Sequence, residues 1–477
     1  MNRQIRRLSI VFGVLMFIMM LNLSFQQVFL ADSTKARDGN ARVLLQEYDR
    51  ERGPIRVQAS QVARSEPTDD ALKYLRVYSN GPLYAPATGF YSIVYGATGI
   101  EKTDNSVLNG TGPAFFVDRL KQLFGGEQVQ GGAVTLTLDP AAQEAAADAL
   151  GNAVGSVTAI DPKTGAVLAL VQSPSFDPNR LSSHDQPEIT EYYESLEADP
   201  SQPLLNRPLV STQPPGSTFK LITSAAALDA GYEPDSLFPG PALYTVPGTN
   251  DTIPNFWRGP CGPDDAITLE EALTISCNTA FTYIGNELGD EALKAQAEKF
   301  GFNTAFAIPL AAAESRYPSN LNATQTAQSS IGQYNVAATT LQMAMVGASI
   351  ANGGVTMVPY LVQDTRGANL EIISSTKPQQ HATAMTPENS AKLLGMMESV
   401  VERGTGTMAQ IPGVRVGGKT GTAETDPSRP NVSWFVGVAP LDDPKIAVAV
   451  AIEDSKGAAA GPLAMTTARN VIEATLQ

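Results

Sequence analysis

The sequence predicts a mixed α/β protein in which strands from both ends of the main domain form one sheet against a block of helices. Two patterns in the last two thirds of the chain predict this. Strand-like segments occur at both ends of that region, and a long run of helical segments lies between them. The composition agrees, because 43% of the 477 residues are hydrophobic, which is enough for a sizeable core in two or three domains.

The first 31 residues (1–31) predict a membrane anchor. The segment from Leu8 to Phe25 is almost wholly apolar, and about 20 such residues span a bilayer as a helix. Three arginines precede it, so a short N-terminus is expected in the cytoplasm and the rest of this single-pass chain outside the cell membrane. A cleaved signal peptide is one alternative, although the residues around Ala31 form a poor cleavage site. A buried core helix is the weaker alternative, because the three arginines would fit badly in a core.

Residues 32–150 are expected to form a stalk and a small non-catalytic domain that acts as a pedestal. Residues 32–60 are polar and charged, and residues 61–130 carry scattered aromatic residues and turn signals. Residues 133–138 alternate as in a strand. Asp139 and Pro140 then open an alanine-rich helix that ends at a glycine.

Residues 151–477 are expected to form the main domain. Residues 157–171 predict a hairpin, and residues 173–208, rich in Pro, Ser, Asp and Asn, are expected to be a long irregular surface segment. The later elements are predicted as helices at 221–231, 267–276, 290–301 and 336–354, strands within 414–425, 432–440 and 445–454, and a closing helix from about Pro462.

Charge and residue counts exclude several classes of function. The net charge is −15 and no basic run occurs, so a nucleic-acid partner is not expected. The chain has only two histidines, His184 and His381, and neither lies near a nucleophile-elbow pattern of a Ser-His-Asp hydrolase. With two cysteines, a zinc site is not expected either.

Export permits a disulfide, and we hypothesise that Cys261 and Cys277 pair; two unpaired core residues are the alternative.

Ser217 and Lys220 form the first candidate catalytic pair. Pro214 and Pro215 cannot lie inside a helix, so a helix is expected to begin at about Gly216 or Ser217. Residues three apart on a helix share one face. A serine hydroxyl needs a base to take its proton, and a lysine can be that base if burial or a nearby cation lowers its pKa.

Two further motifs offer matching chemistry. Ser276 and Asn278 flank Cys277 and supply a hydroxyl and an amide that can relay protons and bind a peptide. The run Lys419-Thr420-Gly421-Thr422 is expected on a strand, where Lys419 and Gly421 share one face and the two threonines share the other. Each motif alone has an ordinary structural explanation, as a surface helix, a polar loop and a glycine-rich turn.

The three motifs together are far more specific than any one of them. Ser-x-x-Lys, Ser-x-Asn and Lys-Thr-Gly occur in this order, 59 and 143 positions apart. This is the signature set of acyl-serine enzymes that include the penicillin-binding proteins and class A β-lactamases.

With these motifs, the chain resembles the class B penicillin-binding proteins, the monofunctional D,D-transpeptidases, and is most similar to the actinobacterial penicillin-binding protein A group. The likeness covers nearly the whole chain. It is carried by ERGPI (51–55), NGPLYAPATGFYS (80–92), IDPKTGAVLALVQSPSFDPN (160–179), LNRPL (205–209), PPGSTFK (214–220), IGQ (331–333) and GGKTGTAE (417–424). The likeness implies the transpeptidase and serine β-lactamase-like fold, with an antiparallel central sheet, in residues 151–477.

The resemblance also implies a role for each motif residue. Ser217 would attack the penultimate D-Ala carbonyl of a peptidoglycan stem peptide, Lys220 would take its proton, and Ser276 and Asn278 would complete the relay and the substrate contacts. Lys419, Thr420, Gly421 and Thr422 would bind the substrate or β-lactam carboxylate, with the N–H groups of Ser217 and Thr422 as the oxyanion hole. β-Lactam antibiotics would be covalent inhibitors, and no metal or cofactor would be needed.

Several alternatives remain at the level of sequence. A serine β-lactamase would need a placed deacylating base, for which the acidic residues of 184–199 are candidates only by proximity. A non-catalytic β-lactam receptor or a scaffold of cell division would not need Ser217. The resemblance further implies a role in cell-wall synthesis and cell division with a glycosyltransferase or division partner, and carboxypeptidase activity at the same site.

Overall fold

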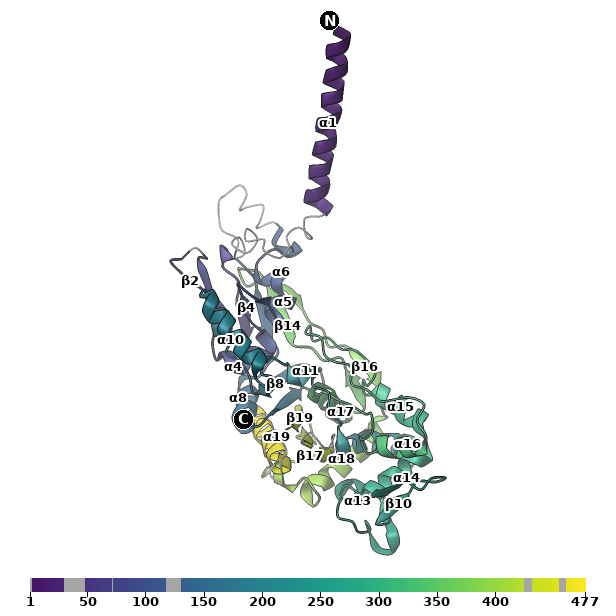
Figure 1. The fold of residues 1–477 in the computed structure, drawn as a ribbon. Coiled ribbons are helices and arrows are strands. Elements are labelled where there is room, and N and C mark those ends of the chain that lie inside the picture. Colours follow the sequence, from purple (N-terminus) through teal and green to yellow (C-terminus); the bar gives the residue numbers. More distant parts are fainter. Residues whose placement is uncertain (1, 30–47, 71, 117–129, 424–430, 454–459) are drawn as a thin grey trace.

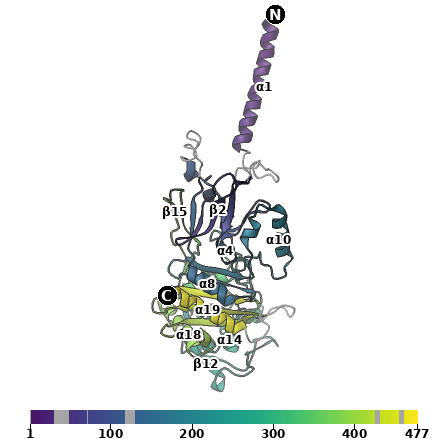
Figure 2. The ribbon, with the colours of Figure 1, turned by 90° about the vertical axis from the view of Figure 1, so that its left-hand side faces the viewer.

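The computed structural model describes residues 2–29, 48–70, 72–116, 130–423, 431–453 and 460–477. Figure 1 shows an elongated molecule with a projecting N-terminal helix, an upper sheet and a lower, larger lobe, and Figure 2 shows the same layers from the side. The first part of the predicted stalk, residues 32–47, and Glu424 of the third motif lie outside the described residues. Helix α1 (Asn2–Phe29) contains a segment, Arg3–Gln26, that is long and apolar enough to cross a membrane, and a signal sequence would have the same properties.

The upper sheet has six strands and is built from two distant parts of the chain. Its order is β15-β14-β6-β1-β2-β3, and only the β1–β6 pair is parallel. The strands are β1 (Ile55–Val57), β2 (Ser60–Pro67), β3 (Tyr74–Tyr78), β6 (Ala133–Leu136), β14 (Val362–Arg366) and β15 (Ile372–Ser375). The segment predicted as a strand at 133–138 is therefore a strand, and it belongs to this upper sheet.

A buried ion cluster ties the start of this domain together. Glu101 is fully buried, and its carboxylate accepts hydrogen bonds from Arg52 Nε at 2.5 Å and Arg76 Nε at 2.7 Å. Tyr78 donates its hydroxyl to the same carboxylate at 3.1 Å. Because buried charges are tolerated only when they are paired and hydrogen-bonded, these residues hold the strands and the helix α5 (Gly99–Thr103) in one arrangement.

The lower lobe contains the predicted sheet of early and late strands, in the order β17-β18-β19-β7-β8 with every neighbouring pair antiparallel. The strands are β7 (Gly155–Ile160), β8 (Val167–Ser173), β17 (Gly417–Ala423), β18 (Val432–Ala439) and β19 (Ile446–Ile452). The prediction that β7 and β8 meet the last strands in one sheet is confirmed. Helices cover both faces, which explains why β18 and β19 are buried at every position rather than at alternate positions.

One face of this sheet packs against α8 (Pro140–Leu150) and the closing helix α19 (Ala460–Leu476). The other face packs against α17 (Thr340–Ala351), which is buried along its whole length. The remaining helices of the lower lobe are α12 (Lys220–Asp229), α13 (Leu269–Thr274), α14 (Asn278–Leu288), α15 (Asp290–Lys299), α16 (Ala323–Ser329) and α18 (Pro387–Glu402). These elements form the helical block expected from the sequence.

The shorter elements complete the chain between these units. They are α4 (Gly81–Thr88), β4 (Tyr91–Ser92), β5 (Gly96–Ala97), α6 (Asn105–Leu108), η1 (Pro113–Phe115), η2 (Gly216–Phe219), β9 (Leu237–Pro239), β10 (Leu243–Thr245), β11 (Thr252–Pro254), η3 (Pro263–Asp265), β12 (Ala266–Thr268), β13 (Val355–Met357), β16 (Gln380–Thr383) and η4 (Thr407–Ala409).

The segment 173–208 differs from the expected irregular surface segment, because it contains two helices and the start of a third. They are α9 (Pro178–Leu181), α10 (Gln186–Ala198) and α11 (Arg207–Val210). The Asp and Pro residues that suggested loops serve instead as helix starts: Asp185 caps α10 by accepting the N–H of Glu188, and a proline follows in the first turn.

The two domains also divide the chain differently from a single cut after residue 150. Helix α8 lies before that cut but packs on β8 and α19 of the lower lobe, and β14 and β15 lie after it but extend the upper sheet. Long-range strand pairing of this kind leaves no local pattern in the sequence. A division before Asp139, with residues 362–375 assigned to the upper sheet, keeps α8 with the lower lobe and β14 and β15 with the upper sheet.

Candidate active site

Ser217 lies on a short 3-10 turn where the chain enters the helical block. The turn η2 runs from Gly216 to Phe219 and continues directly into α12. The helix therefore starts at the expected position, but its first turn is a 3-10 turn. Thr218 closes the turn by donating its hydroxyl to the Pro215 carbonyl at 2.7 Å. Ser217 is partly exposed, whereas its neighbours Thr218 and Phe219 are buried.

Gly216 allows this turn to approach the third motif closely. Its φ is +53°, and a Cβ at this position would lie 2.7 Å from the Thr422 carbonyl oxygen. Gly421 makes the matching approach from the other side, because a Cβ there would lie 2.9 Å from the Pro215 carbonyl oxygen. The backbone around Ser217 and the strand β17 are therefore in direct contact, as only glycines permit. Trp434 on β18 adds a hydrogen bond from Nε1 to the Pro214 carbonyl at 2.9 Å.

Lys220 is fully buried and points at the second motif. Its Nζ lies 2.8 Å from the Ser276 carbonyl, 3.2 Å from Ser276 Oγ and 2.7 Å from Asn278 Oδ1. Burial, together with the charge of Lys419, holds the pKa of Lys220 well below its ordinary value. When this amine is neutral, its nitrogen has a free electron pair and can accept the proton of Ser276 Oγ.

The second motif is held between α13 and α14 by local backbone geometry. Ser276 adopts the left-handed conformation with φ of +63°, which turns the chain sharply before α14 begins. Cys277 is the N-cap of α14, and its Sγ accepts the N–H of Ala280 at 3.4 Å. Asn278 anchors its amide by donating from Nδ2 to the Pro254 carbonyl at 3.2 Å, which leaves Oδ1 for Lys220.

Asn255 supports this motif and was not identified from the sequence. Its side chain is fully buried, and its Oδ1 accepts the N–H groups of Asn278 at 2.9 Å and of Thr279 at 3.0 Å. It thus satisfies two of the unpaired donors at the start of α14. Its Nδ2 has three oxygens within hydrogen-bond distance, including Thr279 Oγ1 at 3.1 Å, for its two hydrogens. No motif surrounds Asn255, so only the folded structure reveals its role.

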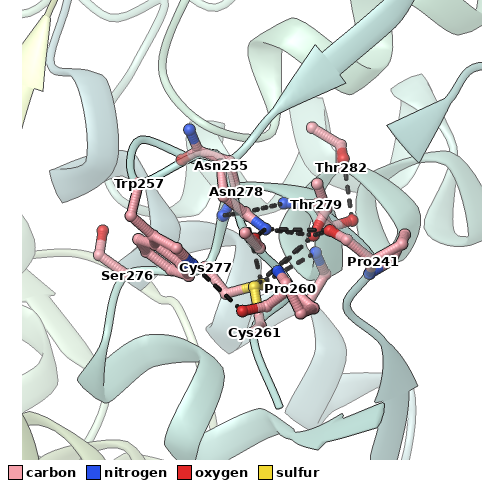
Figure 3. The surroundings of a disulfide bond; sticks show 12 residues. Pro241, Asn255, Trp257, Pro260, Cys261, Ser276, Cys277, Asn278, Thr279 and Thr282 are labelled. Carbon is pink, nitrogen blue, oxygen red and sulfur yellow. Dashed lines mark hydrogen bonds between the residues drawn. A yellow bond between two sulfur atoms is a disulfide. The ribbon is translucent and has the colours of Figure 1, made fainter. Parts of the chain in front are cut away.

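The expected cysteine pair is a disulfide in the structure. Cys261 and Cys277 are bonded, with Cα atoms 6.0 Å apart. Figure 3 shows the disulfide with Asn255, Asn278 and Thr279 gathered around it. The bond connects the segment that carries Asn255 to Cys277, the middle residue of the second motif. The segment of the buried Asn255 is therefore covalently linked to the motif that Asn255 supports.

The third motif lies on β17 at the edge of the sheet, with the alternation that the sequence predicts. Lys419, Gly421 and Ala423 are buried, whereas Thr420 is half-buried and Thr422 is exposed. Lys419 Nζ donates to the Thr420 carbonyl at 2.9 Å. Burial lowers the pKa of Lys419 to about 7. The charge of Lys419 lowers the pKa of Lys220, so the two amino groups influence each other within one site.

The two histidines take part in other contacts. His184 Nδ1 lies 2.5 Å from an Asp70 carboxylate oxygen, and the His381 ring packs edge-on against Phe306. The structure brings the predicted motif residues together in two places. The turn η2 contacts β17, and Lys220 contacts Ser276 and Asn278. A buried lysine beside a serine, a second hydroxyl and a second cation can support nucleophilic acyl transfer.

Comparison with known proteins identifies the family. The model of the penicillin-binding protein transpeptidase domain matches residues 155–473, and that of the penicillin-binding protein A dimerisation domain matches residues 52–134. The chain belongs to the penicillin-binding protein transpeptidases. The predicted family and fold are therefore confirmed, and the matched ranges correspond to the lower lobe and to most of the upper domain.

Relatives of this penicillin-binding protein align over its full length. The chain is 44% identical to "Peptidoglycan D,D-transpeptidase PbpA" of Mycolicibacterium smegmatis, covering 100% of this chain and 99% of the relative. It is 42% identical to the PbpA of Mycobacterium tuberculosis, with the same coverage. The structure of penicillin-binding protein A from M. tuberculosis in an imipenem acyl-enzyme complex superposes with a TM-score of 0.87 at 40% identity, covering 91% of this chain and 100% of that one.

Proposed function

We propose that this chain is a peptidoglycan D,D-transpeptidase that cross-links stem peptides through an acyl intermediate on Ser217. The observation that carries the proposal is the position of Lys220, a fully buried lysine whose Nζ contacts both Ser276 and Asn278. Burial and the charge of Lys419 lower its pKa, which favours the neutral amine, and a neutral amine is the base that a serine nucleophile requires.

Acylation begins when Lys220 accepts the hydroxyl proton of Ser217. The Ser217 oxygen forms a bond to the carbonyl carbon of the penultimate D-Ala, and the bond from that carbon to the terminal D-Ala nitrogen breaks. The proton passes from Lys220 through the Ser276 hydroxyl to the leaving amine, since Ser276 Oγ lies within 3.2 Å of Nζ. The amine of a second stem peptide then attacks the ester, returns a proton to Ser217 and completes the cross-link.

The positive and hydrogen-bonding groups of β17 bind the charged end of the substrate. Lys419 supplies positive potential from a buried position, and Thr420 and Thr422 present hydroxyls on the more exposed face of the strand. The N–H groups of Ser217 and Thr422 form the proposed oxyanion hole. The close approach of Gly216 to Thr422 supports this assignment, because it brings these two stretches of backbone together.

The same arrangement accounts for inhibition by β-lactams, which carry a reactive amide and a carboxylate in the positions of D-Ala-D-Ala. Penicillin-binding protein A from M. tuberculosis forms acyl-enzyme complexes with imipenem and with penicillin G. We propose that these antibiotics likewise acylate Ser217 of this chain and remain bound as the ester.

The location that fits this reaction is the outer side of the cell membrane. Helix α1 is the proposed uncleaved anchor, with its arginine-containing end in the cytoplasm and the rest of the chain outside. The upper domain, which matches the dimerisation model, is the proposed attachment point for a glycosyltransferase or another protein of cell division.

A β-lactamase would also form the acyl-serine but would hydrolyse it through a placed base. The acidic residues considered for that base lie largely on α10, which packs beside Phe90, Phe176 and Leu181 in the upper part of the molecule. Both views place α10 away from α14 and the second motif (Figures 1 and 2). A long-lived acyl-enzyme is therefore the expected behaviour.

The direct test is transpeptidation by the full-length protein in detergent. The protein is supplied with a peptide donor ending in D-Ala-D-Ala and an amine acceptor, and release of D-Ala and formation of the new amide are followed by mass spectrometry. We expect both products with the wild type and neither with Ser217→Ala. A carboxypeptidase alone would release D-Ala without the amide. A scaffold would give neither product, and Ser217→Ala would still support growth of cells that depend on the gene.

A further inference from the structure

Thr405 lies outside the three motifs and contacts the third of them. It follows the C-terminal end of α18, in the segment that leads to β17. Its hydroxyl oxygen lies 2.6 Å from the hydroxyl oxygen of Thr420, a normal distance for an O–H···O hydrogen bond. Thr420 is the central residue of the Lys-Thr-Gly motif, so the contact reaches the proposed carboxylate-binding group directly.

The backbone of Thr405 is held in place from the side of the second motif. Its N–H donates to the Thr274 carbonyl at 3.2 Å, two residues before Ser276. Gly404 lies so close to the same carbonyl that a Cβ there would be 2.3 Å from its oxygen. Arg403 also forms ion pairs with Glu270, at 3.1 Å, and Glu271 on α13. The segment therefore docks on the helix that ends at the second motif and presents one hydroxyl to the third.

The hydroxyl of Thr420 has one proton to donate and two acceptor positions. Lys419 Nζ lies 3.5 Å from this oxygen and can fill one acceptor position, and the Thr405 hydroxyl can fill the other. When both are filled, the single proton of Thr420 points away from the protein and is available to a bound carboxylate, which only accepts hydrogen bonds.

We propose that Thr405 is a positioning residue for the reaction: it donates its hydroxyl proton to Thr420 and so orients the Thr420 proton toward the carboxylate of the substrate or β-lactam. This inference rests on the proposed function of the site. It identifies a residue outside the three motifs that contributes to binding of the carboxylate.

The test compares the acylation rate constants of full-length wild type, Thr405→Val, Thr405→Ser and a matched control, Thr407→Val, with benzylpenicillin. Valine has the shape of threonine without the hydroxyl, and serine restores it. Thr407 is an exposed threonine two positions further along the same segment. Losing one hydrogen bond lowers the rate constant about three- to ten-fold. We expect this loss in Thr405→Val and rates close to wild type in Thr405→Ser and Thr407→Val.

The decisive readout is the same substitution in a Thr420→Val background. If Thr405 acts through the Thr420 hydroxyl, Thr405→Val causes no further loss once that hydroxyl is absent. A full further loss in this background, or a Thr405→Ser rate as low as that of Thr405→Val, would overturn the inference and indicate a merely structural role. Equal acylation of wild type and Thr405→Val would also refute it while leaving the proposed function intact. Failure of the wild type to be acylated at all would instead contradict the proposed function.

Discussion

Nζ of Lys220 lies 2.7 Å from Oδ1 of Asn278, a residue 58 positions later in the chain. The contact joins the first turn of α12 to the first turn of α14 and places the lysine amine beside an amide in the protein interior. Neither helix can move relative to the other without breaking it. The contact therefore ties Lys220 directly to the second motif.

Replacing Lys220 should abolish acylation and leave the fold intact. In Lys220→Met, an apolar side chain of similar length fills the buried space while the base is lost, and acylation by penicillin should slow by about a hundred-fold or more. Acylation is followed by mass spectrometry, and folding by circular dichroism. Lys445→Met, at an exposed lysine of the same domain, should acylate as wild type. Normal acylation of Lys220→Met would exclude Lys220 as the base.

The rate of acylation should decrease at alkaline pH because Lys419 loses its charge. The rate rises with pH as the lowered pKa of Lys220 is passed and the amine becomes neutral. It then falls through a pH of about 7, where Lys419 loses the charge that attracts the carboxylate. An arginine stays charged across this range, so Lys419→Arg should lose the alkaline fall. A fall at the same pH in folded Lys419→Arg would contradict the role assigned to Lys419.

Glu101 should be essential for stability. Burial acts to raise its pKa, but Arg76 and Arg52 outweigh burial, and the pKa is lowered. Its contribution to stability is therefore present above the ordinary carboxylate pKa and is lost as the pH falls through the lowered value. Glu101→Gln leaves two buried arginines without a counter-charge and should cost about 3–5 kcal/mol of unfolding free energy.

The control for Glu101 is the exposed ion pair of the same domain. Glu66 pairs with Arg64 at 2.5 Å, but its side chain is 47% exposed, whereas that of Glu101 is fully buried. Glu66→Gln should cost less than about 1 kcal/mol. Denaturant unfolding at neutral pH measures both variants, and equal losses would show that burial of the Glu101 cluster is not what stabilises this domain.

The disulfide should be present in the purified protein and should stabilise the lower lobe. Thiol titration of the unfolded, unreduced chain should detect no free thiol. The bond closes a loop of 16 residues, so Cys261→Ser/Cys277→Ser should lose about 3 kcal/mol of stability. Serine at 277 can keep the helix cap that Cys277 Sγ provides to Ala280. Two free thiols in the wild type would show that the bond does not form.

The chemistry of the site could be predicted from the sequence because it lies in short local motifs. The spacing of Ser217 and Lys220 predicts a shared face, and the apolar runs of β18 and β19 predict buried strands of one sheet. The supporting residues could not be found in this way. Asn255 and Thr405 lie in segments without periodicity, and their roles depend on contacts with residues 23 and 15 positions away.

The domain organisation was the least predictable part for a similar reason. Strands β14 and β15 join the upper sheet from a position more than two hundred residues after β6, to which β14 pairs. Short polar strands carry weak local signals, and their pairing is decided by the finished fold. Helix α10 was missed because Asp185 and Pro187, which begin it, are also typical loop residues.

The account depends most directly on a covalent bond from Ser217. Full-length wild type and Ser217→Ala are incubated with a fluorescent penicillin, and the intact mass and the labelled peptide are determined over several hours. We predict a long-lived adduct on the wild type, located on the peptide that contains Ser217, and no adduct on Ser217→Ala. A folded wild type that forms no adduct, forms it on another residue or releases it rapidly as hydrolysed antibiotic would contradict the account.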